Sequence, residues 1–483
     1  MIALTERNKN SIILGTVAIF AIVTLIYPVV RSFYRFEISY NEGWNIYNAL
    51  KVIDHIPLYN AKYSWTTTNY PALSFYVLAY LSRITHNYLL TGRLLSLLSL
   101  AISCGLIGLI IHKLTRNFAA SFFGAFFCLA FFCCTDASTY VGLNDPQMFA
   151  QVFFLSGLLL YVAKPPTLGC MAEVATLFII GGCIKQNLIE FPLTVFVDLL
   201  FVSRRKAIQY VLFSGALLGI AIALNIKLGG PLFIRNVAGP RSYSLSKAIV
   251  AFFNSYGQIS VPVLIACIWV VRNLKDKARR PICIFFIASL FVGATIAGGN
   301  GVNVNTYFGN FFAISIIMAL VAHDTWEAST TLLGHRIIWR HVIPVALTTY
   351  LLVPFFVSDS FASWRQLGTL PEEQKRFDQE TSFLRAHPGP AICESLLRCY
   401  YAGKPYEIDP FNSTRFVRAN KLDSGEIVRK IEMHQYGAIQ LNRPVESFKR
   451  PSNRFPDEVL DAIRQYYVPS LTEPNCVIYV PNH

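Results

Sequence analysis

Two acidic residues stand out because each follows an asparagine and adjoins a predicted helix on one side of a membrane. Glu42 lies in SYNEGWNIY and Asp145 lies in GLNDPQMF. A carboxyl group at a membrane–water boundary loses part of its hydration, which raises its pKa toward the pH at which it can exchange protons. Two such groups brought together could activate a hydroxyl or orient a cation. Helix capping is an equally supported interpretation, since Asp and Asn are favoured at helix starts.

Basic residues on the same side of the membrane form a second group of candidate site residues. Arg93 opens a predicted spanning helix, and Lys185 lies at the outer tip of a short predicted hairpin. Arg235, Arg241 and Lys247 follow in a later outer segment. The planar fork of arginine and the point charge of lysine both suit a phosphate or pyrophosphate. The alternative is snorkelling to lipid headgroups, which we favour for Lys247 and weigh equally for Arg93 and Lys185.

A third candidate feature is the stretch GGNGVNVNTYFGN, residues 298–310. Its glycines allow close backbone approach and its asparagines supply amide donors at the mouth of a predicted helix. A tight turn is the simpler interpretation of the same residues.

The elements that must position these side chains are predicted by composition. Of the 483 residues, 54% are hydrophobic and only 14% are charged, whereas soluble domains carry about 25% charged residues. The net charge of +14 could indicate a nucleic-acid partner, but no nucleic-acid motif accompanies it. A Lys/Arg surplus is typical of the cytoplasmic loops of membrane proteins. The chain is therefore predicted to be an α-helical polytopic membrane protein without a nucleic-acid partner.

The apolar runs predict about eleven spanning helices, because about 20 apolar residues cross a bilayer and shorter runs are tolerated where it thins. These runs lie at residues 11–31, 89–111, 117–135, 148–163, 171–184, 188–203, 207–226, 250–271, 281–297, 307–322 and 341–357. With the N-terminus inside, the even-numbered connections collect the positive charges, including Arg204, Arg205 and Lys206. An odd number of spans then places the C-terminal segment outside.

The chain is predicted to divide into a membrane domain, residues 1–357, and a soluble domain, residues 358–483, where the composition becomes charged and proline-rich. The outer loop 32–88 contains two apolar stretches, which we interpret as helices lying on the outer leaflet. Short apolar runs and one helix-like stretch predict a small α/β fold for the soluble domain. Cys393 and Cys399 could pair in an oxidising compartment, but Cys476 leaves the pairing open.

The stretch from NEGWNIYNALKVIDHIPLYN to GRLLSLLS resembles the first outer loop of the GT-C superfamily of membrane glycosyltransferases. It resembles most closely bacterial enzymes of the type that includes the lipid A aminoarabinose transferase, the rhizobial core galacturonosyltransferases and the protein O-mannosyltransferases. NDPQMFAQVFFLSGLL, IKQNLIEFPLTVFVDLL, NVNTYFGNFF and YYAGKPYEIDPF follow in the expected order. The resemblance thus covers most of the chain and implies a GT-C fold.

The resemblance implies that a sugar passes from a polyprenyl-phosphate carrier to a lipid, glycan or protein acceptor outside the cytoplasm. It places Glu42 and Asp145 in the acidic motifs, with Glu42 expected to be the catalytic acid–base group. Many relatives have an Asp-Glu pair in the first loop, whereas here Asn41 precedes Glu42. The remaining expected contacts are, for the donor phosphate, Lys185, Arg93 and Arg241, and for the substrate, Asn41, Asn69, Tyr70, Asn305 and Tyr307.

No nucleotide is expected, because the glycosyl-phosphate bond stores the energy and the chain has no phosphate-binding P-loop motif. A divalent metal near Glu42 and Asp145 is compatible with the pair, but two carboxylates alone are weak evidence for one. The relatives also imply a bacterial inner membrane and a periplasmic active site, and we expect the protein to be a monomer. Two alternatives remain, a polymerase or ligase of lipid-linked sugars and a flippase or transporter without transfer chemistry.

Overall fold

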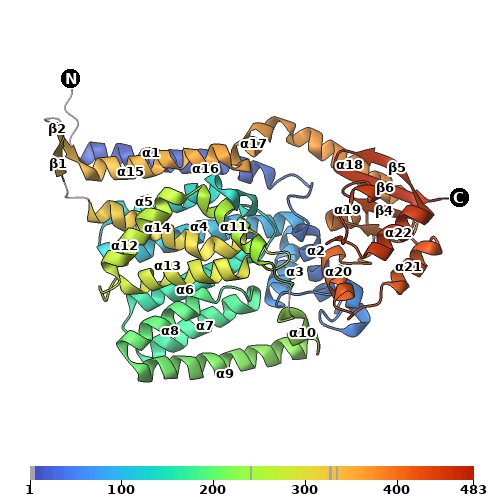
Figure 1. Cartoon of the computed structure of the whole chain (residues 1–483), viewed down its shortest axis with the longest axis horizontal. Helices are drawn as coiled ribbons and strands as arrows, with labels where there is room; N and C mark the ends of the chain where they lie inside the picture. The colour runs from blue at the N-terminus through green and yellow to red at the C-terminus, as the bar shows by residue number, and fades with distance from the viewer. Residues whose placement is uncertain (1–5, 240–241, 326–328, 333–334, 483) are drawn as a thin grey trace.

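The computed structural model of the chain describes residues 6–239, 242–325, 329–332 and 335–482. These residues are mostly helical. Apolar helices form a bundle, with the C-terminal domain at one end and the β1–β2 hairpin near the other (Figure 1). The bundle helices are α1 (Glu6–Arg31), α4 (Tyr88–Thr115), α5 (Phe118–Cys134), α6 (Gln147–Ala163), α7 (Leu168–Ile184), α8 (Glu190–Val202), α9 (Arg204–Gly229), α11 (Leu245–Gly257), α12 (Ser260–Asn273), α13 (Arg280–Ile296), α14 (Phe308–Asp324), α15 (Trp339–Tyr350) and α16 (Leu352–Val357).

A helix lies at each of the predicted spanning positions, but their lengths differ. Among the described residues, four helical segments are long and apolar enough to cross a membrane: α1, α4, α9 and the segment Val304–Asp324. Two bent helix pairs raise that number to six if each pair forms one span. Several others, such as α5 and α6, have 17 residues, fewer than the roughly 20 of a full crossing. The eleven crossings therefore stay a prediction.

The predicted single helix 250–271 is wrong, because α11 and α12 meet at an angle of 93°. Pro262 lies in the first turn of α12 and has no N–H to donate to the carbonyl group of Gln258, so a continuous helix would lose a hydrogen bond there. The hydroxyl group of Tyr350 donates to that carbonyl oxygen over 3.3 Å. A side chain from α15 thus stabilises the break.

Large apolar side chains stay exposed on the outside of the bundle. On α9, Leu212 is 68% exposed and Leu228 is 62% exposed. A continuous apolar surface of this kind needs a lipid or protein partner. Together with the spanning-length helices, it defines a multi-pass membrane protein.

The outer loop holds the helical elements that surround the candidate site. They are α2 (Asn41–Ile53), η1 (Ala61–Thr66) and α3 (Leu73–Thr85), joined from other loops by η2 (Asp136–Tyr140), α10 (Phe233–Val237) and η3 (Val304–Tyr307). Both predicted outer-loop helices are present. On α3, Tyr80 and Ile84 remain exposed, as expected at a membrane surface. Nearly every residue of α2 is buried by protein, so α2 offers little surface to a lipid leaflet, and its place at the membrane surface stays a prediction.

The C-terminal part is a small α/β unit around a four-stranded sheet with strand order β3-β4-β6-β5. Strands β3 and β4 are parallel, and the other neighbouring pairs are antiparallel. A disulfide bond joins Cys393 to Cys399. The elements are α17 (Asp359–Arg365), η4 (Gln366–Thr369), α18 (Leu370–Ala386), β3 (Ala391–Cys393), α19 (Leu396–Tyr401), α20 (Pro410–Arg418), α21 (Gly425–Glu432), β4 (Ala438–Leu441), η5 (Val445–Ser447), α22 (Asp457–Tyr466), β5 (Tyr467–Glu473) and β6 (Cys476–Pro481), and the separate hairpin pairs β1 (Ser329–Leu332) with β2 (His335–Ile338).

Candidate active site

Each of the first five residues of α2, NEGWN, has a contact of its own. Two of these contacts reach the same loop, and the others reach different parts of the molecule. Successive helical residues point about 100° apart, so five of them cover all sides of the helix. Asn41 Nδ2 donates to Asp145 Oδ2 over 3.1 Å. One turn later, Asn45 Nδ2 donates to the carbonyl oxygen of Asn144 over 2.8 Å. Residues 41 and 45 share one helix face, and this face holds the loop before α6.

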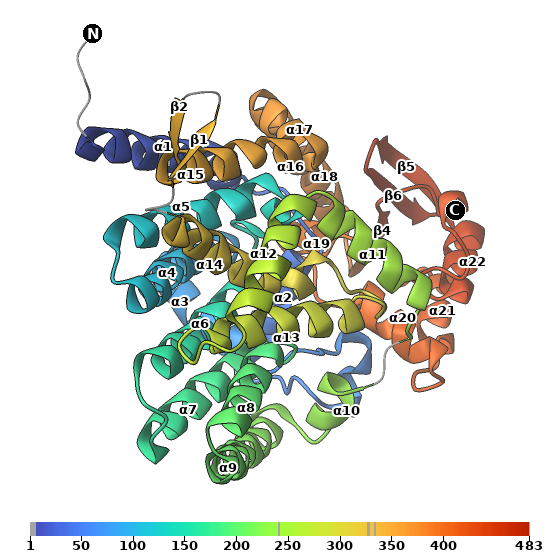
Figure 2. The ribbon, with the colours of Figure 1, turned by 60° about the vertical axis from the view of Figure 1, so that its left-hand side comes forward.

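The opposite side of α2 faces the C-terminal domain. A Cβ atom on Gly43 would lie 2.3 Å from the backbone nitrogen of Leu397, so only glycine lets α2 and α19 approach this closely. Trp44 Nε1 donates to Asp409 Oδ2 over 2.7 Å. Asp409 caps α20 and accepts the backbone N–H groups of Phe411 and Asn412. The C-terminal domain is therefore anchored one helix turn from Asn41, and α10 lies on the same side of the bundle as α20 (Figure 2).

Glu42 and Arg93 form a closed ion pair. Arg93 Nε lies 2.7 Å from Glu42 Oε1, and Arg93 Nη2 lies 2.6 Å from Glu42 Oε2. The backbone N–H groups of Ile38 and Asn144 also donate to the carboxylate, over 2.8 and 3.2 Å. Each oxygen of Glu42 therefore accepts two hydrogen bonds, and both side chains are 0% exposed.

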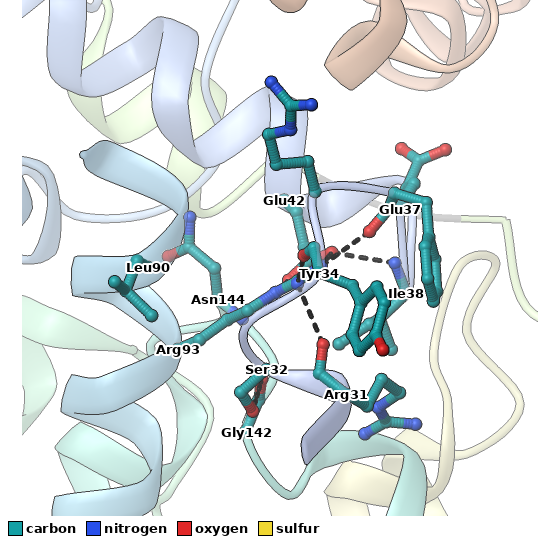
Figure 3. Close-up of polar contacts among 12 residues, drawn as sticks. Arg31, Ser32, Tyr34, Glu37, Ile38, Glu42, Leu90, Arg93, Gly142 and Asn144 are labelled. Carbon is teal, nitrogen blue, oxygen red and sulfur yellow. Dashed lines mark hydrogen bonds and ion pairs between the residues drawn. The ribbon is translucent and has the colours of Figure 1, made fainter. Parts of the chain in front are cut away.

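The remaining donors of Arg93 bind carbonyl groups at the end of α1 and in the loop that follows, and Figure 3 shows the contact with Arg31. Its Nη1 donates to the carbonyl oxygens of Tyr34 and Arg31, and its Nη2 donates to that of Phe36. A guanidinium has five N–H groups, and these contacts use them. No donor is left for a substrate phosphate, and no lone pair of Glu42 is left for an acceptor proton.

Asp145 and Lys185 form a second buried pair. Lys185 Nζ lies 2.8 Å from Asp145 Oδ1, with side chains 3% and 2% exposed. The same oxygen accepts the backbone N–H of Gln147 over 2.9 Å, and Asn41 binds the other oxygen. Lys185 Nζ also lies 4.5 Å from the ring centre of Tyr70, a cation–π contact. An ammonium can turn about its stem to a new partner more readily than a forked guanidinium can.

A polar hollow of 210 Å³ opens beside Lys185. Its lining includes Tyr70, Gln186, Asn187 and Asn305. Asn305 Nδ2 donates to Gln147 Oε1 over 3.1 Å, which links the loop of residues 298–310 to the Asp145 loop. The Oε1 atom of Gln186 and the Oδ1 atom of Asn187 are buried without a hydrogen-bond partner in the described part of the chain. The hollow thus offers one cation and unpaired amide oxygens.

A larger apolar groove of 760 Å³ adjoins the polar hollow, and the two share Gln186 and Val237. The groove runs between α7, α8 and α9, where Phe178 and Leu218 line it. An apolar tail with a polar head would span both spaces. A long unbranched or methyl-branched chain is the ligand type that such a groove buries.

The other predicted residues fall in different places. Arg241 lies outside the described residues. Arg235 is exposed above the ring of Phe416, and Lys247 Nζ donates to the carbonyl oxygen of Gly299 over 2.7 Å.

Asn69 and Tyr307, two further predicted substrate contacts, lie in different places. Asn69 is buried and lines a narrow hollow together with Asn41 and Tyr70. Tyr307 is 1% exposed and packs against Tyr256 in the bundle core, away from this hollow. The structure therefore brings Asn69 to the site but not Tyr307.

A divalent metal does not fit the two carboxylates. All lone pairs of Glu42 are taken by N–H donors, and the neighbour of Asp145 is a lysine ammonium. In the part of the chain that the structure describes, no three His, Cys, Asp or Glu side chains lie together as metal ligands.

A third carboxyl group in the outer loop, Glu37, contacts the C-terminal domain. Its carboxylate accepts the hydroxyl of Ser395 and lies 3.9 Å from Arg398. Burial, which outweighs the attraction of Arg398, raises the pKa of Glu37 to about 7. This loop–domain contact was not predicted from the sequence, because an isolated glutamate five residues before Glu42 carries no pattern.

The fold of the chain is similar to that of several solved structures. No family model matches the chain, and no curated protein matches it significantly in sequence. Among solved structures, ArnT from Cupriavidus metallidurans in the apo state is similar at a TM-score of 0.60 and 12% identity, over 96% of this chain and 97% of that one. The ArnT structure bound to undecaprenyl phosphate gives 0.59 and 13%, over 96% and 98%.

The oligosaccharyltransferase AglB from Archaeoglobus fulgidus, in complex with an inhibitory peptide and a dolichol-phosphate, is also similar. It gives a TM-score of 0.51 at 12% identity, over 98% of this chain and 74% of that one. At these identities the likeness establishes a shared fold.

Proposed function

We propose that the chain is a glycosyltransferase that moves a sugar from a polyprenyl-phosphate donor to a hydroxyl of an acceptor. The observation that carries the proposal is the continuity of the 760 Å³ apolar groove with the 210 Å³ polar hollow at Lys185. The groove suits a polyprenyl tail, and the hollow suits a phosphate and its sugar. Structures of similar fold have bound undecaprenyl phosphate and a dolichol-phosphate.

Donor binding would change the partner of Lys185. Its ammonium lines the hollow and pairs with Asp145 Oδ1 over 2.8 Å. A phosphate that enters the hollow competes for this ammonium, and Lys185 can turn toward it without leaving its site. Asp145 then keeps the N–H of Gln147 and the amide of Asn41 but loses its cation. A carboxylate that loses a cation becomes a stronger base. In this proposal, donor binding therefore prepares Asp145 to accept a proton.

The transfer step follows from these positions. The acceptor hydroxyl gives its proton to Asp145, and its oxygen attacks the anomeric carbon from the face opposite the phosphate. The new glycosidic C–O bond forms as the C–O bond to the lipid phosphate breaks, so the configuration inverts. The departing polyprenyl phosphate carries the electron pair and is stabilised by Lys185. The proton on Asp145 returns to solvent or to the phosphate after product release.

In this proposal, Glu42 and Arg93 act by holding other parts of the site in position. Their pair ties α2 to α4, and Glu42 accepts the N–H of Asn144, the residue before Asp145. Asn41, at the position of the expected first-loop Asp, holds Asp145 Oδ2. The expected base role of Glu42 therefore passes to Asp145 in this proposal, and the phosphate role of Arg93 passes to Lys185.

The proposed setting is a bacterial inner membrane with a periplasmic site. The positive-charge bias of the predicted inner loops supports this orientation. The disulfide bond between Cys393 and Cys399 supports a C-terminal domain in an oxidising compartment. We propose that the protein acts as a monomer.

The test uses the full chain in lipid nanodiscs with radiolabelled undecaprenyl-phosphate and dolichyl-phosphate sugars and a bacterial glycolipid extract. Label moving to the extract, with release of polyprenyl phosphate, is the expected result. Lys185→Met should remove both, and Arg235→Met, an exposed cation beyond the hollow, is the matched control.

Two results would overturn the proposal. Movement of the intact donor across proteoliposomes, without release of polyprenyl phosphate, would indicate a flippase. Extension of a lipid-linked glycan by whole repeat units would indicate a polymerase or ligase.

A further inference from the structure

A narrow hollow lies where α20 of the C-terminal domain meets the start of α2. Tyr40, Asn41 and Asn69 line it from the membrane domain, and Phe411 and Asn412 line it from α20. Its volume is 20 Å³, enough for one hydroxyl-sized group, since a single water needs about 10–15 Å³. The hollow shares Tyr70 and Gly301 with the 210 Å³ hollow beside Lys185, so a group placed here adjoins the proposed donor sugar.

Asn412 presents an unused hydrogen-bond acceptor at this hollow. The side chain is 4% exposed, and its Oδ1 atom has no partner among the residues that the structure describes. Its Nδ2 atom donates to Asp409 Oδ2 over 2.6 Å. Because a carboxylate can only accept, this contact determines which end of the amide is nitrogen. A buried amide oxygen without a donor is costly, and an O–H group in the hollow would supply one.

The position of Asn412 is set by contacts on both sides. Asp409 holds the start of α20 to α2 through Trp44. Phe411 packs on Gly301, where a Cβ atom would lie 2.3 Å from the ring and where φ is +75°, so any other residue would push the ring away. Across the hollow, Asn41 donates to Asp145. Asn412 and Asn41 therefore line the same small space, and Asn41 connects that space to the proposed base.

We propose that Asn412 is a specificity-determining residue whose Oδ1 atom accepts a hydrogen bond from a hydroxyl of a saccharide acceptor. The C–H faces of a sugar pack on aromatic rings and its hydroxyls bind amides, and this hollow combines the rings of Tyr40, Tyr70 and Phe411 with amides. The membrane domain then binds the donor, while the C-terminal domain selects the acceptor. This inference rests on the proposed glycosyl transfer and adds the acceptor class to it.

The test measures two reactions of the full chain in nanodiscs. The first is hydrolysis of the donor, in which water replaces the acceptor. The second is transfer to octyl pyranosides of gluco, galacto and manno configuration, each compared with its monodeoxy analogues, and to an acetyl-Gly-Ser-Gly amide peptide. Asn412→Ala and Asn412→Leu are compared with Asn475→Ala, an asparagine of the β5–β6 turn away from the hollow.

The wild type should transfer to a pyranoside and lose about tenfold in kcat/KM when one particular hydroxyl is removed. Both Asn412 variants should lose that discrimination, so that the parent and deoxy acceptors react equally, while donor hydrolysis stays within twofold of the wild type. A purely structural role would instead lower hydrolysis and transfer together.

Three results would overturn the inference. They are transfer to the peptide but to none of the pyranosides, donor hydrolysis without transfer to any probe, and discrimination that persists in both Asn412 variants. In each of these the donor still reacts, so glycosyl transfer chemistry stands. A wild type that neither hydrolyses nor transfers any donor would overturn the proposed function itself.

Discussion

The two buried ion pairs of the site differ in what surrounds them. Glu42 and Arg93 are 0% exposed, and their hydrogen-bonding atoms are used within the protein. Asp145 and Lys185 are almost as buried, but Lys185 borders a 210 Å³ hollow and can change its partner. Burial alone therefore does not distinguish the two pairs. Access to a cavity does, and we propose a functional role for the pair that has it.

The largest expected effect is on stability, at the closed pair. Glu42→Gln leaves the guanidinium of Arg93 buried without its counter-charge, and breaking a buried pair in this way costs about 3–5 kcal/mol. Thermal unfolding in detergent should show the loss. The double variant Glu42→Gln/Arg93→Met should be less destabilised than the sum of the two single variants. An unfolding midpoint equal to that of the wild type would contradict a structural role.

The next effect is on activity, at the open pair. Lys185→Met should lower the transfer rate about 10²–10³-fold, the cost of removing one group that stabilises a leaving anion. Its loss of stability should be smaller than that of Glu42→Gln, because solvent in the hollow can reach the atoms left behind. The two variants should thus rank in opposite order in rate and stability assays, with Lys185→Arg keeping part of the activity. The same rank order in both assays would contradict the proposed difference between the two ion pairs.

A smaller effect is expected where α2 meets the C-terminal domain. Gly43→Ala places a methyl group 2.3 Å from the backbone of Leu397, and such overpacking costs about 1–3 kcal/mol. Gly15→Ala in α1 is the matched control, since nothing lies within 4 Å of its Cβ position. Unfolding midpoints and limited proteolysis of the C-terminal domain should separate the two. Equal behaviour would show that α19 does not need this contact.

The smallest effect is the pH response of Glu37, whose carboxylate contacts the C-terminal domain. The pKa of Glu37 is raised from 4.5 to about 7, so the folded state binds more protons than the unfolded state between these values. The contribution of this group to stability is therefore greatest below pH 4.5 and is lost as the pH rises through 7. Unfolding measured from pH 5 to 8 should show the decline in the wild type and not in Glu37→Gln. A decline that Glu37→Gln retains would assign it to another group.

Much of the fold was predictable because its signals are local. Apolar runs marked every bundle helix, and the composition change near residue 358 preceded the α/β unit. The features that the sequence did not predict arise from distant contacts. The kink at Pro262 is stabilised by Tyr350 from a distant helix, and α2 packs against a domain more than 300 residues away in sequence.

The sequence by itself determined the membrane class and the candidate acids and bases, because run length, charge bias and residue type are properties of short segments. Only the tertiary structure decided that Arg93 pairs with Glu42, that Lys185 pairs with Asp145, and that Asn412 lines a hollow together with Asn41. These partners are 51, 40 and several hundred residues apart. Hydrogen-bond saturation and cavity access depend on all the elements that meet at a point, and no single segment contains that information.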